Sequence, residues 1–285
     1  MKDSIEILRP KMLRNLAHGN PDIFLGEDFA VLYRISGSLA VLKEKMMAVP
    51  QYIEVGRLIR LTAGTAKFRI NLLPVELEAG NVLIVPENCY IEISELSADF
   101  NVQIVSFKEL PISFPRFAHL RLNEVDFHRT GDYIDLIWNV IHKPSFSMQT
   151  VSFLLAALMN DLLHIYQQVE QGKRILTRSE KLMQEFVDLV AEHGAKERNV
   201  SFYAEKLLLT PNYLSAFIRK HSNKSVMQWL NERTLLQAKA LLKHTNQSIS
   251  EIAFLLNFAE VTLFSRFFKR ETGMTPKEFR NLRLL

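Results

Sequence analysis

The chain has 285 residues, of which 48% are hydrophobic and 23% charged, with a formal net charge of +4. This length allows two domains of ordinary size. Apolar runs stay below the ~18 residues that a membrane span needs, and the first 20 residues contain no apolar core typical of a signal peptide. The single cysteine, Cys89, excludes an internal disulfide and a multi-cysteine metal site. We therefore expect a cytoplasmic protein with no membrane partner.

The positive charge is concentrated in the C-terminal part. Residues 177–285 contain 17 Lys/Arg and 11 Asp/Glu, a net charge of +6, whereas residues 1–176 contain 18 and 20, a net charge of −2. A basic excess of this size suits a polyanionic partner such as nucleic acid. A solvated surface that happens to be basic would have the same composition, so charge alone leaves both interpretations open.

Short β-strand patterns fill the region from about residue 28 to residue 107, after an irregular arm over residues 1–25. Residues 67–72 and 101–107 alternate polar and apolar side chains, and the apolar run 82–85 ends at Pro86. Several short strands separated by Gly, Pro and Asn predict an antiparallel sandwich or small barrel. The segment 77–86, Leu-Glu-Ala-Gly-Asn-Val-Leu-Ile-Val-Pro, resembles the Gly-strand-Pro segment of cupin barrels.

The predicted barrel lacks the residues of a metal enzyme. None of the eight histidines lies between His18 and His119, and a catalytic cupin needs paired histidines with a carboxylate. We therefore expect no enzyme activity, no metal and no cofactor. An apolar cavity for a small-molecule effector and a fully packed core are both compatible with the pattern.

Two helices are expected at about residues 131–168, after the strands. The first carries Tyr133 and Ile137 at helical spacing and ends at Pro144. The second, residues 148–168, repeats apolar residues at three-four spacing, which indicates packing against the barrel or pairing with its copy in a homodimer. The polar stretch that follows predicts a boundary between residues 1–172, a cupin-like sensing and dimerisation domain, and residues 173–285.

The C-terminal part is expected to be all helical. After a helix over residues 178–193, residues 200–221 contain a helix, a turn and a second helix that starts with the N-cap Thr210 and with Pro211. A long helix at about residues 225–243 follows.

The helix-turn-helix pattern then returns at residues 248–271. Ser248 and Glu251 form a capping box, and Asn257 stands where the chain must turn, because asparagine tolerates a left-handed backbone. The next helix is expected to turn four apolar residues inward: Leu263, Phe264, Phe267 and Phe268. Ala204 and Ala253 occupy equivalent places 49 residues apart, so the motif is an internal repeat.

The C-terminal residues resemble the AraC/XylS family of bacterial transcription regulators. The resemblance covers residues 178–283 and depends on Ile252-Ala253, Asn257-Phe258, Phe267-Phe268-Lys269 and Gly273-Met274-Thr275-Pro276, with support from Ala204, Tyr213-Leu214 and Lys224-Ser225. It implies two recognition helices in successive major grooves, ~34 Å apart. It also implies an N-terminal sensing and dimerisation domain, and contact with RNA polymerase as a further partner.

Carried over position by position, the resemblance implies which side chains meet double-stranded DNA. Side chains facing bases are Asn212 and Ser215 in the first recognition helix, and Val261, Thr262, Ser265 and Arg266 in the second. Side chains facing phosphates are Arg219, Lys220, Lys224, Lys269 and Arg270. Arg266 suits a bidentate contact with guanine and Asn212 one with adenine. Ala216 departs from the family pattern, which often has a polar reader there, and Asn223 and Asn257 replace frequent glycines.

We therefore expect a sequence-specific transcription regulator that responds to a small-molecule effector in the N-terminal barrel. The alternative is a ligand-independent regulator whose barrel serves only for dimerisation or protein contacts. A metal-dependent cupin enzyme with a DNA-binding appendage is disfavoured by the missing barrel histidines.

Overall fold

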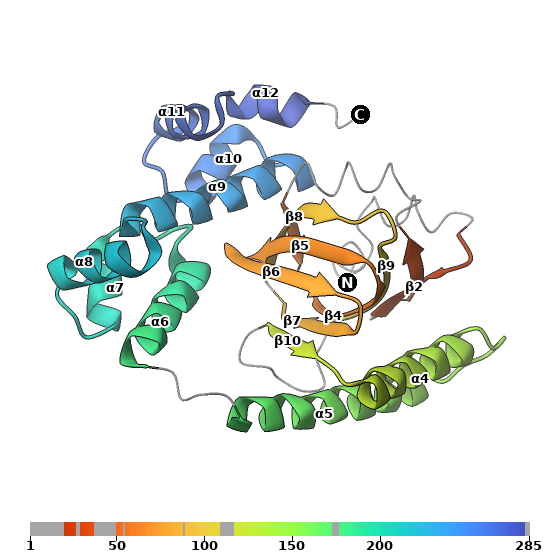
Figure 1. Ribbon diagram of the computed structural model, residues 1–285. Coiled ribbons are helices and arrows are strands. Elements are labelled where there is room, and N and C mark those ends of the chain that lie inside the picture. The colour runs from red at the N-terminus through yellow and green to blue at the C-terminus, as the bar shows by residue number, and fades with distance from the viewer. Residues whose placement is uncertain are drawn as a thin grey trace. The chain divides into compact units, whose positions relative to one another are not determined.

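The computed structural model describes residues 20–26, 29–36, 50–53, 55–87, 89–108, 117–172 and 177–282, and divides the chain into two compact units (Figure 1). The first unit comprises Met1–Met47 and Tyr52–Lys173, and the second Ala48–Gln51 and Arg174–Leu285. Of the irregular arm expected at residues 1–25, residues 1–19 lie outside the described part, and Ile23–Leu25 form a strand that pairs with Phe29–Ser36.

The first unit is built from two antiparallel sheets. One has the strand order β1-β2-β9-β4-β7-β10 and the other β3-β8-β5-β6. The strand bounds are β1 Ile23–Leu25, β2 Phe29–Ser36, β3 Gln51–Ile53, β4 Gly56–Ala63, β5 Thr65–Ile70, β6 Leu73–Glu78, β7 Asn81–Val85, β8 Cys89–Leu96, β9 Asn101–Phe107 and β10 Ala118–Arg121.

The strand patterns explain how the sheets pack. Side chains of β5 alternate strictly between exposed and buried, so one face of its sheet meets water, whereas all five residues of β7 are buried, so both faces of the other sheet are covered. One buried cluster joins the two sheets and includes Leu61, Phe68 and Ile91. The predicted fold class, a mainly-β cupin-like unit with following helices, is confirmed, with two facing sheets in place of a closed barrel.

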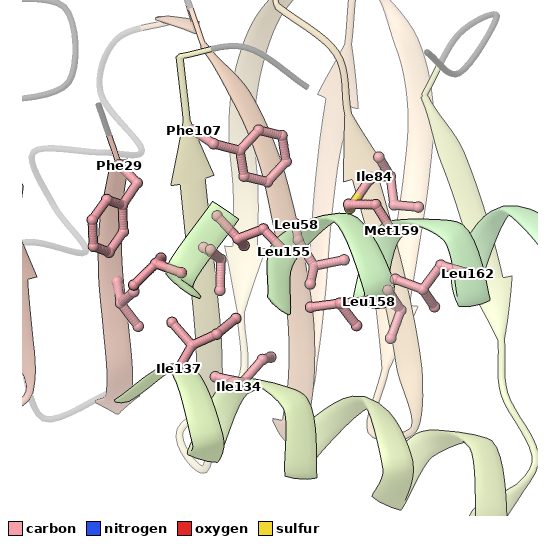
Figure 2. Packing of buried hydrophobic residues seen from close by; sticks show 14 of the residues in the cluster. Phe29, Leu58, Ile84, Phe107, Ile134, Ile137, Leu155, Leu158, Met159 and Leu162 are labelled. Carbon is pink, nitrogen blue, oxygen red and sulfur yellow. The ribbon is translucent and has the colours of Figure 1, made fainter. Parts of the chain in front are cut away.

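Helices α4 (Glu124–Ile141) and α5 (Met148–Gly172) belong to a second cluster of the first unit. Figure 2 shows Ile134 and Ile137 of α4, and Leu155, Leu158 and Leu162 of α5, in one apolar layer with strand residues such as Leu58 and Ile84. The packing interpretation of the apolar stripe at residues 148–168 is therefore confirmed. Pairing of α5 in a homodimer remains a prediction.

Helix α4 begins earlier than the sequence pattern indicated. It starts at Glu124, not near residue 131, because the side chain of Asn123 accepts a hydrogen bond from the backbone N–H of Asp126 and caps the first turn. Gly131 lies inside this helix and is buried. A Cβ at this position would lie 2.9 Å from Nη2 of Arg60, whose guanidinium also donates to the carbonyl oxygen of Phe127. The absence of a side chain at Gly131 thus leaves room for the guanidinium of Arg60 against the helix.

Within the described ranges, α5 is the one helix long and apolar enough to pass a length-and-composition test for a membrane span, with a mean hydropathy of 1.3 over its best window in Met148–Val169. Five of its apolar residues are nevertheless buried in the cluster with the sheet: Val151, Leu155, Leu158, Met159 and Leu162. Core helices pass the same test, so this result does not indicate a membrane partner.

From residue 177 to residue 282 the described part of the second unit contains helices and no strand, as expected. Its helices are α6 Arg178–His193, α7 Val200–Lys206, α8 Pro211–Ser222, α9 Val226–His244, α10 Ile249–Leu255, α11 Val261–Thr272 and α12 Pro276–Asn281. Capping boxes start α6, α9, α10 and α12. Because each capping box satisfies backbone donors at a defined residue, the starts of these helices are fixed locally.

Candidate nucleic-acid interface

Two helix-turn-helix motifs, α7–α8 and α10–α11, have matching turns. The backbone N–H of Leu209 donates to the carbonyl oxygen of Ala204 at 2.8 Å, and that of Phe258 donates to Ala253 at 2.9 Å. Ala204 and Ala253 are both buried. A small side chain at this point lets the first helix of each motif approach the second closely, so the repeat predicted from the alanine spacing is present in the structure.

The left-handed residues of the turns follow the prediction in part. Asn257 has φ 56° in the second turn, and Asn223 and Gly273, with φ 55° and 78°, end the two recognition helices. The equivalent turn position in the first motif is Leu208, with φ 56° and a side chain that is 92% exposed. Sequence reasoning missed Leu208, because leucine carries no turn signal and rarely adopts this backbone conformation.

Helix α8, the first candidate recognition helix, is fixed at its N-terminus and along one face. The Thr210 side chain accepts from the backbone N–H of Tyr213, and Pro211 occupies the first turn. Leu214, Phe217 and Ile218 are buried. The side chains expected at DNA form a row at three- and four-residue spacing on the opposite, exposed face: Asn212, Ser215, Arg219 and Lys220.

Helix α11, the second candidate recognition helix, has a buried aromatic face formed by Phe264, Phe267 and Phe268. The prediction that Leu263 also turns inward is wrong, since this side chain is 46% exposed. Leu263 lies one residue before Phe264, so the helix rotates it about 100° away from the centre of the buried face.

The four base-contact candidates of α11 differ in their environment. Arg266 is exposed and pairs with no acidic residue in the described part of the chain. Val261 is 38% exposed and Ser265 is partly buried. The Thr262 hydroxyl donates to a carboxylate oxygen of Glu260 at 2.9 Å. Arg266 is therefore the most available of the four for a bidentate contact.

The phosphate-contact candidates fall into two groups. Arg219, Lys220 and Lys269 are exposed at the C-terminal ends of the recognition helices. Nζ of Lys224 lies 2.7 Å from a carboxylate oxygen of Glu232, and Nη2 of Arg270 lies 2.6 Å from Oε1 of Glu271. A phosphate would have to compete with these carboxylates, so we expect the unpaired cations to contribute more to DNA affinity.

The described residues contain no group of three or more His, Cys, Asp or Glu side chains that could hold a metal ion. Cys89 is buried, and the side-chain amide of Asn71 donates to its sulfur at 3.4 Å.

The helix-turn-helix unit matches a known family. Residues 203–282 match a family model described as a helix-turn-helix domain. This segment is similar to AraC-type helix-turn-helix domains. It contains both turns, both recognition helices and the connecting helix α9.

Bacterial transcription regulators are among the relatives. The chain is 28% identical over 157 residues to the uncharacterised regulator YijO of Escherichia coli K12, a match that covers 53% of each chain. It is 32% identical over 89 residues to the transcriptional activator RhaS of Escherichia fergusonii, which covers 31% of this chain and 32% of RhaS. The matches thus span about half and about a third of the relatives' own lengths.

The structure of ToxT from Vibrio cholerae O395 resembles this chain over 90% of its residues and 98% of those of ToxT. The sequence identity is 14% and the TM-score is 0.42. We therefore transfer no residue role from ToxT to this chain.

Proposed function

We propose that this protein is a cytoplasmic, sequence-specific transcription regulator that inserts α8 and α11 into successive major grooves of double-stranded DNA. The observation that carries the proposal is the duplicated motif, in which each recognition helix buries one face and presents polar and basic side chains on the other. A helix of this kind fits the major groove, where base edges are distinguishable.

The length of α9 supports binding to two grooves. Its 19 residues give a rod of roughly 28 Å at 1.5 Å per residue, close to the ~34 Å between groove centres one helical turn apart. Its buried side chains contact both motifs. Nε1 of Trp229 donates to the hydroxyl of Ser222 in α8 at 3.0 Å, while Ala238 and Leu242 belong to the buried cluster around α11. A rigid connection of this length favours simultaneous engagement of two neighbouring grooves.

Within this proposal the side chains divide by role. Asn212, Ser215, Val261, Thr262, Ser265 and Arg266 face base edges, and Arg219, Lys220, Lys224, Lys269 and Arg270 face phosphates. Base contacts determine the sequence that is bound, whereas phosphate contacts position the protein on the duplex and determine its salt dependence.

Two roles are open to the first unit, and they give two forms of the proposal. In one, a small molecule bound between the sheets regulates DNA binding. In the other, the unit serves only for dimerisation, including pairing through α5, or for contacts with RNA polymerase or another protein. The described residues between the sheets form a continuous apolar cluster, so an effector would have to be largely apolar or would have to displace side chains.

Selection from a random duplex library with the full chain tests DNA recognition. We expect enrichment of fragments that contain two short conserved segments about one helical turn apart. No enriched sequence, or a single conserved segment, would contradict binding by two helices. A thermal-shift screen with small molecules then separates the two forms, because a true effector at ~100-fold excess over its Kd stabilises by about 2.7 kcal/mol.

A further inference from the structure

The six-residue loop Gly194–Asn199 between α6 and α7 contacts both helix-turn-helix motifs. Its last residue, Asn199, caps α7 by accepting from the backbone N–H of Ser201 at 2.9 Å. The buried hydroxyl of Tyr203 in α7 donates to the carbonyl oxygen of Glu197 at 2.9 Å. The C-terminal half of the loop is therefore attached to the first motif.

The same loop is also attached to the second motif. Ala195 is buried in the cluster that contains Phe264, Phe267 and Phe268. The side-chain amide of Asn257, the left-handed turn residue, donates to the carbonyl oxygen of Lys196 at 3.1 Å. Each of these contacts involves the turn or the recognition helix of the second motif, so the loop touches the elements that determine how α11 is oriented.

Arg198 contacts two aromatic rings of the second motif. Its guanidinium carbon lies 3.6 Å from the centre of the Phe258 ring, in the second turn, and 5.2 Å from the centre of the Phe267 ring in α11. Its Nε and Nη2 atoms are buried and have no hydrogen-bond partner among the described residues. Burial, and then the charge of Arg270, lower the pKa of Arg198. Burial removes the guanidinium from water, and its main remaining contacts are the faces of the two aromatic rings. A cation–π interaction is strongest when the cation is desolvated.

A third set of contacts holds the beginning of the loop on α9. The Thr234 hydroxyl donates to the carbonyl oxygen of Gly194 at 3.2 Å, and Nε of Arg233 donates to the carbonyl oxygen of Ala191 at 3.1 Å. Both Arg233 and Thr234 are buried. A Cβ at Gly194 would lie 2.5 Å from the carbonyl oxygen of Val190 in the last turn of α6 and 3.2 Å from Cγ of Arg233 in α9, so glycine is required where α6 ends beside α9.

We propose that this loop is a brace between the two motifs and that Arg198 is its positioning residue. The connecting helix α9 sets the distance between the recognition helices, while the brace sets the orientation of α11 relative to α8. The inference rests on the proposed function only where it predicts how Arg198 affects DNA binding. The brace itself is a property of the free protein.

The first experiment measures the distance between the recognition helices without DNA. Spin labels are attached through Ala216→Cys on α8 and Leu263→Cys on α11, both at exposed positions, in a Cys89→Ala background that removes the only native cysteine. A change in the orientation of α11 moves the label attached to it, so we expect one narrow distance distribution in the parent and a broader one after Arg198→Ala. Lys206→Ala is the matched control, because Nζ of Lys206 lies 5.7 Å from the centre of the Phe202 ring within the first motif, and it should leave the distribution narrow.

A distribution as narrow in Arg198→Ala as in the parent would overturn the brace. If Arg198→Ala fails to fold, as judged by circular dichroism, Arg198→Lys tests the same point, since an ammonium group does not reproduce the flat stacking of a guanidinium. In that variant too, broadening supports the brace and an unchanged distribution overturns it.

The second experiment uses the best fragment enriched from the random duplex library. Inserting one base pair between its two segments should weaken binding of the parent, and Arg198→Ala should reduce this discrimination by about tenfold, within the range of couplings between contacting residues. If Arg198 instead contacted a phosphate directly, Arg198→Ala would weaken binding equally to the selected fragment and to the fragment with the inserted base pair, and would make the salt dependence shallower. That result would contradict the brace. Failure to enrich any fragment would count against DNA recognition and leave the distance measurement as the test of the brace.

Discussion

Leu208 offers a direct test of how the first turn is built. Its φ of 56° places it in the left-handed region, and 92% of its side chain is exposed. The left-handed conformation costs an L-residue with a Cβ roughly 1–2 kcal/mol, and asparagine tolerates it much better. Asn257 occupies the equivalent position of the second turn with the same φ, so the fold itself shows that asparagine fits there.

We expect Leu208→Asn to stabilise the second unit by about 1 kcal/mol. The relief of backbone strain is opposed only by the small apolar area that Leu208 buries, which is worth about 0.3 kcal/mol or less. Leu208→Gly should stabilise less, since glycine increases the entropy of the unfolded chain by about 0.5–1 kcal/mol. For a unit of this size, 1 kcal/mol corresponds to a rise of about 4 °C in Tm.

Urea denaturation followed by tryptophan fluorescence measures the effect in the full chain. The two tryptophans are Trp138 in α4 and Trp229 in α9, so a Trp138→Phe background reports on the second unit alone. Asn257→Leu is the mirror variant and should destabilise, because it introduces the strain and removes the hydrogen bond to Lys196. If Leu208→Asn left the midpoint unchanged or lowered it, the strain at this turn would be refuted.

Three further predictions concern single side chains. Arg266→Ala should cost about 1–3 kcal/mol of binding to the selected fragment and relax specificity at one base pair; isotherms on fragments with single-base changes check this. Lys269→Ala should weaken all sequences about equally and make the salt dependence shallower by about one phosphate contact, so a loss confined to one sequence would contradict it. Hydrogen bonds from the Ser248 backbone and hydroxyl lower the pKa of Glu251. The resulting stabilisation is present above the unfolded-state pKa and is lost as pH falls through the folded-state pKa, so urea midpoints between pH ~7 and ~3 should change less in Glu251→Gln than in the parent.

The second unit could be predicted well because its signals are local. Thr210 and Ser248 cap helices within their own sequence neighbourhood, and the three-four spacing of Phe264, Phe267 and Phe268 fixes the buried face of α11. Each of these features involves residues fewer than five positions apart. The helix bounds therefore agree with the pattern to within one or two residues.

The fold class of the first unit was predicted, but its details were not, because its contacts join residues that are far apart in the sequence. The start of α4 at Glu124 was missed, since Asn123 resembles an ordinary loop residue until its side chain is seen to cap the helix. The close contact of Gly131 is with the guanidinium of Arg60, which lies on β4. No local pattern connects a glycine in one helix to an arginine in a strand, and the same holds for the stacking of Arg198 on Phe258 in the second unit.

The duplicated motif predicts unequal roles for the two recognition helices. Ala216 and Arg266 occupy equivalent, exposed positions of α8 and α11, and only the arginine can make a bidentate contact to a base pair. Each good bidentate contact discriminates by about 1–3 kcal/mol, whereas an alanine methyl offers only apolar contact.

Single-base substitutions across the selected fragment should therefore cost more affinity in the segment bound by α11 than in the segment bound by α8. The α11 segment is the one that contains the base pair at which Arg266→Ala relaxes specificity. Equal losses across both segments would show that Asn212 and Ser215 contribute as much discrimination as Arg266, and would contradict the inequality inferred from Ala216.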